Sequence, residues 1–192
     1  GLCRLPRLRV LEVLTGILTV PNLLTFCRLL ALPAVILLFR YDHFIAASLL
    51  FLGAMLTDVI DGWLARLMDQ RSRLGLYLDS VVDKILILAL FYELAYAGML
   101  HWTIPHLFLV RELLHNGVRC AAAGSGTVVG ANWMGKAKAC LQTAVICAGL
   151  ALPALTCPVG CMVLFEVSAV VVLAIAWLFF FSFAYRNRRL IS

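Results

Sequence analysis

Six long apolar stretches, separated by short polar connections, limit what this chain can fold into. They cover roughly residues 21–39, 44–67, 75–97, 104–123, 134–153 and 162–185. A helix needs about 20 mostly apolar residues to cross a membrane. The composition agrees, because the mean hydropathy is +1.00 and only 14% of the residues are charged. The sequence therefore predicts an all-α integral membrane protein with six transmembrane helices.

The basic residues predict how these helices are oriented. If the N-terminus is cytoplasmic, most of the basic residues fall on the cytoplasmic side, as expected when positive charge is retained inside; they are Arg4, Arg7, Arg9, Arg66, Arg71, Arg73, Lys136, Lys138, Arg186, Arg188 and Arg189. Both termini are then cytoplasmic. We expect a basic interfacial segment at residues 1–20, the helical domain at residues 21–185 and a basic tail at residues 186–192.

Four aspartates in two adjacent stretches form the first candidate site. Asp58 and Asp61 are three residues apart, and Asp79 and Asp83 are four apart, so each pair shares one helix face. Carboxylates are costly in an apolar segment unless positive charge meets them. No paired Cys or His accompanies them, which favours Mg²⁺ or Mn²⁺ over zinc. A metal-assisted phosphate chemistry is the expected consequence.

A second polar group lies in the stretch at residues 104–123. Arg111, His115 and Arg119 recur every four residues on one face, which we expect to line the bundle interior or a wet cavity. The alternative is an internal ion pair of Arg111 with Glu112 or with an acidic residue of a neighbouring helix. Neighbours in sequence point about 100° apart on a helix, so the pair with Glu112 is expected to be poorly aligned.

The start of the first apolar stretch carries a third polar group. Asn22, Thr25 and Arg28 recur at three-residue spacing and form a polar stripe on an otherwise apolar helix. An interfacial cap with a snorkelling arginine is the simpler interpretation. The stripe lies on the same side of the membrane as the aspartates, however, which favours a role in the site.

The aspartates belong to a longer pattern that carries a family resemblance. Asp58-x2-Asp61-Gly62-x2-Ala65-Arg66-x8-Gly75-x3-Asp79-x3-Asp83 resembles the complete signature of the CDP-alcohol phosphotransferase family. The family commonly has Pro and Ala where this chain has Ser80 and Val82. The resemblance implies transfer of a phosphatidyl group from CDP-diacylglycerol to an alcohol, with release of CMP, at the cytoplasmic ends of the first three helices.

The resemblance also assigns roles within the signature. The first three aspartates would hold two Mg²⁺ or Mn²⁺ ions per site, and Asp83 would act as general base while also touching metal. The residues expected around the CDP group are Asn22, Thr25, Asp61, Gly62, Ala65, Arg66, Ser72 and Gly75. Gly62 and Ala65 have almost no side chain, so phosphates can approach the backbone closely. A homodimer in a bacterial inner membrane is expected from the family, with the mitochondrial inner membrane as the alternative.

The acceptor is predicted from the remaining basic residues. Arg111-Glu112 and Trp133-x-Gly135-Lys136-x-Lys138 resemble segments of the bacterial phosphatidylglycerophosphate synthases. A phosphorylated acceptor suits a basic group, with glycerol 3-phosphate preferred; the residues assigned to its phosphate are Arg28, Arg111, Arg119, Lys136 and Arg186. The net charge of +6 needs no nucleic-acid partner, because anionic headgroups and phosphorylated substrates account for it.

Other functions are compatible with parts of this pattern. Within the family, the acceptor could be phosphatidylglycerol, as in a cardiolipin synthase, or inositol phosphate or serine. A small ion-coupled transporter would also contain aspartates within the membrane. It would spread them through the bilayer and show inverted repeats, whereas here they gather at one face.

Overall fold

The chain folds into a bundle of helices. The computed structural model describes residues 20–67, 73–124, 133–155 and 159–186, and within them the regular structure is entirely helical. These residues form α2 (Val20–Arg40), α3 (Phe44–Leu67), α4 (Arg73–Tyr96), α5 (Thr103–Gly124), α6 (Trp133–Ala151), the 3₁₀ turn η1 (Leu152–Ala154) and α7 (Val159–Arg186). Each helix coincides with one predicted apolar stretch, so the all-α fold class is confirmed.

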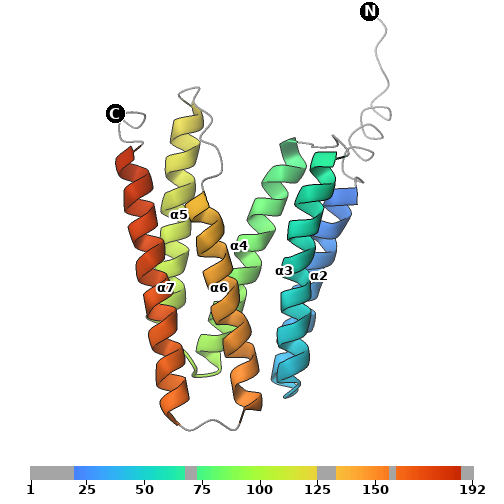
Figure 1. The fold of residues 1–192 in the computed structure, drawn as a ribbon, viewed down its shortest axis with the longest axis vertical. Helices are drawn as coiled ribbons and strands as arrows, with labels where there is room; N and C mark the ends of the chain where they lie inside the picture. Colours follow the sequence, from blue (N-terminus) through green and yellow to red (C-terminus); the bar gives the residue numbers. More distant parts are fainter. Residues whose placement is uncertain (1–19, 68–72, 125–132, 156–158, 187–192) are drawn as a thin grey trace, which may run out of the picture.

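Consecutive helices run in opposite directions along the bundle (Figure 1). α2 packs against α3 and α4, α6 packs against α3, α4 and α7, and α5 packs against α4 and α7. As a result, α2, α4 and α6 begin at the same end of the bundle at which α3, α5 and α7 end. We call this the site end, which is uppermost in Figure 1, and the other the opposite end.

The described helices present an apolar surface. Leu30 is 72% exposed, Leu49 is 63% exposed and Leu164 is 70% exposed, on three different helices. Within the described part of the chain, the stretches Gly135–Ala154 and Gly160–Arg186 are long and apolar enough to cross a membrane. A bundle with leucines on its outside is expected in lipid, where apolar surface carries no penalty.

The core lies where α4 meets its neighbours. Leu90, Phe91 and Leu94 of α4 are fully buried, and the Phe91 ring stacks on that of Phe108 of α5 with ring centroids 4.6 Å apart. Gly149 of α6 is buried in this core. A Cβ there would stand 2.5 Å from the Phe165 ring of α7 and 2.9 Å from Leu94, so only glycine allows this approach.

An ion pair at the opposite end joins α2 to α4. Arg40 donates from Nε to Glu93 Oε1 at 2.6 Å and from Nη2 to Oε2 at 2.9 Å. The guanidinium carbon also lies 5.0 Å from the centre of the Tyr96 ring. We call this arrangement the Arg40–Glu93 clamp. Both oxygens of the buried Glu93 carboxylate accept hydrogen bonds from this one guanidinium.

Candidate active site

The described signature residues lie on α3, which ends at the site end, and on α4, which begins there. Asp58 and Asp61 are near the end of α3, and Gly75 and Asp79 are near the beginning of α4 (Figure 1). Each aspartate pair has the spacing of one helix face, as predicted. The side chains of Asp58, Asp61 and Asp79 lie outside what the structure describes, so the metal site remains a prediction for these residues.

Asp83 is the signature aspartate whose side chain the structure does describe. Arg28 of α2 donates from Nη1 to Asp83 Oδ1 at 2.6 Å. The Arg28 side chain is 1% exposed and that of Asp83 is 24% exposed. The sequence predicted that Arg28 binds the acceptor phosphate. In the structure its guanidinium donates to the carboxylate predicted to be the general base, and its contact with an acceptor phosphate stays a prediction.

A pocket of about 220 Å³ with several charged side chains in its lining includes Asp83 and lies between α4, α5 and α6. Its described lining residues are Asp83, Lys84, Ile87 and Leu88 from α4, Arg111, Glu112, His115 and Arg119 from α5, and Gly135, Lys138, Ala139 and Gln142 from α6. Two of the residues predicted to bind the acceptor, Arg111 and Arg119, therefore line the same pocket as the predicted base.

The charges of the described residues that line this pocket are unbalanced. They comprise four cationic side chains, those of Lys84, Arg111, Arg119 and Lys138, against the two carboxylates of Asp83 and Glu112. With His115 neutral, the excess is two positive charges. Such an excess in a partly buried site attracts an anion of about two charges, which is the charge of a phosphate monoester at neutral pH.

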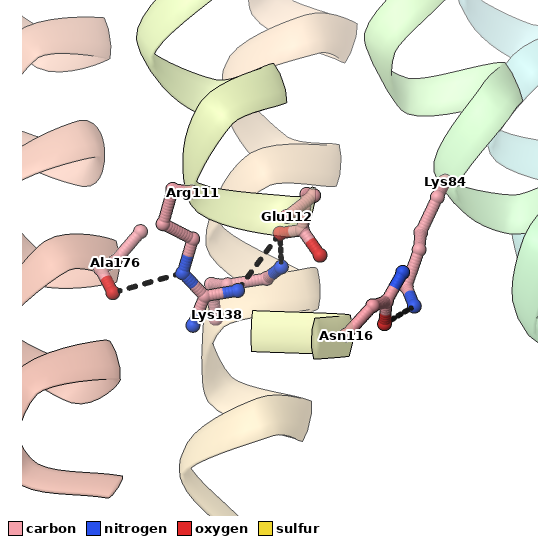
Figure 2. A network of polar contacts seen from close by, with 6 residues as sticks. All are labelled: Lys84, Arg111, Glu112, Asn116, Lys138 and Ala176. Atoms are coloured by element: carbon pink, nitrogen blue, oxygen red, sulfur yellow. Dashed lines mark hydrogen bonds and ion pairs between the residues drawn. The ribbon is translucent and has the colours of Figure 1, made fainter. Parts of the chain in front are cut away.

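Three of these cations, Lys84, Arg111 and Lys138, are held in place by hydrogen bonds, drawn in Figure 2. Glu112 Oε1 accepts from Arg111 Nη1 at 2.8 Å and also from Lys138 Nζ. Arg111 Nε donates to the backbone carbonyl of Ala176 on α7 at 3.1 Å. Separately, Lys84 Nζ donates to Asn116 Oδ1 at 2.6 Å. The network thus connects α5 to α6 and α7, and α4 to α5.

The expectation that Arg111 and Glu112 are poorly aligned was wrong. Their backbone directions do differ, but the long Arg111 side chain bends so that its guanidinium reaches the neighbouring carboxylate. The Ala176 carbonyl holds its Nε in that position. The angle of about 100° between neighbouring helix positions keeps short side chains apart, but an arginine side chain is long enough to reach across it.

The structure separates the predicted acceptor residues into two groups. Arg111 and Arg119 line the pocket, whereas Lys136 and Arg186 are exposed and are not among its described lining residues. Lys138 occupies the pocket face of α6. The sequence analysis did not assign Lys84, Lys138, Asn116 or Gln142 to the site. Gly135, Lys138, Ala139 and Gln142 recur at spacings of three and four, and this periodicity is the signal that favours Lys138 over Lys136.

The predicted CDP-binding residues are only partly described. Asn22 and Thr25 lie in the first turns of α2, and Gly62, Ala65 and Arg66 lie in the last turns of α3. Their side chains are outside the described part, and Ser72 falls outside it altogether. Their backbone positions at the site end agree with a shared location beside α4 (Figure 1), while their contacts with a nucleotide remain predictions.

The comparison with protein families identifies the class to which this bundle and its aspartates belong. Residues 18–182 match the model of a family described as CDP-alcohol phosphatidyltransferase. The match covers most of the chain, and the chain therefore belongs to this family.

Individual relatives carry more particular names. The chain is 33% identical over 163 residues to an Escherichia coli protein named CDP-diacylglycerol–glycerol-3-phosphate 3-phosphatidyltransferase, which covers 80% of this chain and 88% of that protein. It is 41% identical over 109 residues to a Cereibacter sphaeroides protein of the same name, covering 53% and 49% of the two chains.

A third relative carries a different name. The chain is 42% identical over 99 residues to a Schizosaccharomyces pombe protein named as a fusion of cardiolipin synthase (CMP-forming) with a mitochondrial hydrolase. This match covers 52% of the chain and 17% of that protein. The chain thus spans about half the length or less of the Cereibacter and Schizosaccharomyces relatives.

Proposed function

We propose that the protein transfers the phosphatidyl group of CDP-diacylglycerol to glycerol 3-phosphate, giving phosphatidylglycerophosphate and CMP. The observation that carries this proposal is the pocket beside Asp83, whose described lining residues include two more cationic side chains than carboxylates. A phosphate monoester fits this excess of charge, and serine, which has no net charge, does not. The names of the Escherichia coli and Cereibacter relatives support the same acceptor.

The proposed setting is a membrane crossed by all six helices, with the site end in the cytoplasm. Described basic residues near the site end, including Arg119, Lys136 and Lys138, support this orientation under the positive-inside rule. The donor would then present its pyrophosphate at the interface while its acyl chains stay in the leaflet. A bacterial inner membrane and a homodimeric state are part of the proposal.

The metal is proposed to be Mg²⁺ or Mn²⁺, held by Asp58, Asp61, Asp79 and Asp83. Four carboxylates on the ends of α3 and α4 form an all-oxygen donor set, which fits these hard cations. When bound, two such ions would stabilise negative charge on the phosphoryl oxygens. They would also relieve the repulsion expected among four carboxylates that share one site.

The chain's own residues account for acceptor binding and proton transfer in this mechanism. Lys84, Arg111, Arg119 and Lys138 hold the phosphate of the acceptor. Asp83 takes the proton of the acceptor hydroxyl as its oxygen attacks the phosphorus that carries the diacylglycerol group. The new P–O bond forms, the P–O bond of the pyrophosphate bridge breaks, and CMP leaves with that electron pair. Arg28 keeps the Asp83 carboxylate oriented through the 2.6 Å bond.

The test is CMP release from CDP-diacylglycerol by the purified protein with Mg²⁺ or Mn²⁺. Glycerol 3-phosphate, phosphatidylglycerol, inositol phosphate and serine are offered in parallel, and Asp83→Asn serves as the inactive control. Release that requires glycerol 3-phosphate and is lost in the variant is the expected result. Release that requires a different acceptor would replace the substrate while keeping the reaction class.

The second candidate is a cardiolipin synthase that uses phosphatidylglycerol as acceptor. The name of the Schizosaccharomyces relative favours it. Phosphatidylglycerol offers a single negative charge on a phosphodiester, which leaves the charge excess of the pocket partly uncompensated. The parallel assay separates the two acceptors directly, because only one of them would support CMP release.

A further inference from the structure

Glu112 is an unexpected residue in a pocket that would bind phosphate. The residue is 5% exposed, and it lines the pocket among cationic side chains. A buried carboxylate repels an incoming anion. It therefore weakens phosphate binding unless it either organises the cations or selects among acceptors.

The two oxygens of Glu112 have different surroundings. The hydrogen bonds from Arg111 and Lys138 both end on Oε1. In Figure 2 the second oxygen, Oε2, points away from both nitrogens. Within the part of the chain that the structure describes, no hydrogen bond ends on Oε2. A carboxylate oxygen that lines a pocket in this way can accept a hydrogen bond from a ligand.

Glu93 shows how the same molecule arranges a carboxylate that serves only as a counter-ion. Both of its oxygens accept from the Arg40 guanidinium, at 2.6 and 2.9 Å. Glu93 does not belong to the lining of the pocket described above. The contrast indicates that Glu112 does more than neutralise Arg111 and Lys138, because half of its bonding capacity is directed elsewhere.

We propose that Glu112 determines acceptor specificity: its Oε2 accepts a hydrogen bond from the acceptor hydroxyl that does not attack, and its charge repels a carboxylate on the same carbon chain. The pocket then admits phosphorylated alcohols and excludes phosphorylated acids with the same carbon skeleton. This inference rests on the proposed function, since it assumes that the pocket takes a phosphorylated acceptor. Selection here operates by repulsion of the wrong ligand as well as attraction of the right one.

Two ligands separate this role from a purely structural one. Glycerol 3-phosphate and 3-phosphoglycerate share the phosphate and the three-carbon chain, but the second has a carboxylate in place of the primary alcohol. If Glu112 selects, the acid binds more weakly although it carries more negative charge. If Glu112 only organises the cations, the net positive pocket favours the acid.

The experiment measures the Kd of both ligands by isothermal titration calorimetry, using the full chain in lipid nanodiscs. The wild type is expected to bind 3-phosphoglycerate at least about tenfold more weakly than glycerol 3-phosphate, because like charges brought together at a binding site oppose association strongly. In Glu112→Gln the ratio of the two Kd values is expected to fall at least about tenfold, since a neutral amide no longer repels the acid. An unchanged ratio overturns the proposal.

Two control variants are used: one keeps the negative charge at position 112, and the other removes a buried carboxylate elsewhere in the molecule. Glu112→Asp retains the charge and is expected to keep the acid the weaker ligand. Glu93→Gln removes a different buried carboxylate and is expected to leave the ratio unchanged, so a change there also overturns the proposal. If Glu112→Gln does not fold, the wild type decides, because equal or tighter binding of the acid contradicts selection.

Failure of the proposed function is read separately from failure of this inference. If CMP release does not depend on added glycerol 3-phosphate, the proposed acceptor is contradicted, whatever the ratio of the two Kd values. Glycerol 3-phosphate-dependent release together with equal affinity for the two ligands leaves the function standing and overturns the role of Glu112. Absence of binding by both ligands also overturns it.

Discussion

The Arg40–Glu93 clamp at the opposite end and the Glu112 network at the site end are both built around a buried glutamate, yet they differ in stoichiometry. Glu93 meets one guanidinium, which binds both of its oxygens. Glu112 meets two cations through one oxygen, in a pocket lined by two further cations. The first arrangement is balanced, and the second keeps positive charge in excess.

This difference separates an ion pair that holds helices together from one that prepares a binding site. A balanced pair satisfies both partners and leaves nothing for a ligand. An excess of cations is unfavourable for an isolated fold in a low-dielectric setting and becomes favourable when an anion binds. The charge count of a buried cluster therefore distinguishes a structural role from a functional one here.

The largest effect is expected at Asp83, which lines the pocket and accepts a hydrogen bond from Arg28. Asp83→Asn should lower the kcat for CMP release at least about a hundredfold, the usual scale for loss of a general base. Stopped and continuous assays of CMP release with saturating glycerol 3-phosphate measure this. Retention of more than half of the wild-type rate would contradict the assigned role.

The next effect compares two lysines on one helix. Lys138→Met should raise the KM for glycerol 3-phosphate by about ten- to a hundredfold, since a hydrogen bond to a charged group contributes about 1.5–3 kcal/mol. Lys136→Met should change it far less, because the Lys136 side chain is exposed and is not among the described lining residues of the pocket. A larger rise in KM for Lys136→Met than for Lys138→Met would support the sequence-based prediction that Lys136 binds the acceptor phosphate.

Breaking the clamp should affect stability and spare the chemistry. Glu93→Gln leaves the Arg40 guanidinium with a neutral partner, and we expect only a small loss of stability because the Arg40 end of the pair is half-exposed and partly solvated. The apparent Tm in detergent should fall, while kcat/KM for glycerol 3-phosphate should stay within a factor of about two. A selective loss of activity with unchanged Tm would show that the two ends are not independent.

The smallest effect among the site substitutions expected to weaken acceptor binding is at Asn116, which acts on the proposed acceptor by positioning Lys84. Asn116→Leu removes the acceptor of the 2.6 Å bond from Lys84 Nζ. The KM for glycerol 3-phosphate should rise by about three- to tenfold, the value of one ordinary hydrogen bond. Activity assays at low acceptor concentration measure it, and an effect larger than that of Lys138→Met would reverse the order proposed for these residues.

The sequence by itself determined the features that depend on local periodicity and on segment length. Apolar stretches of about 20 residues predict helices, and the structure contains a helix at each of them. The spacing of Asp58, Asp61, Asp79 and Asp83 places each pair on one helix face, because the helical repeat is the same in any protein. The resemblance carried by the signature was confirmed at the level of the family.

The tertiary structure decided which polar side chains meet. Arg28 reaches Asp83 across 55 residues of sequence, and Lys138 rather than Lys136 lies on the pocket face of α6. Arg111 bends towards its own neighbour because the Ala176 carbonyl of another helix holds it. These outcomes follow from how each helix is rotated against its neighbours, which is set by close packing such as that around Gly149. Local sequence fixes a helix and its faces, but only packing between helices fixes where each face points.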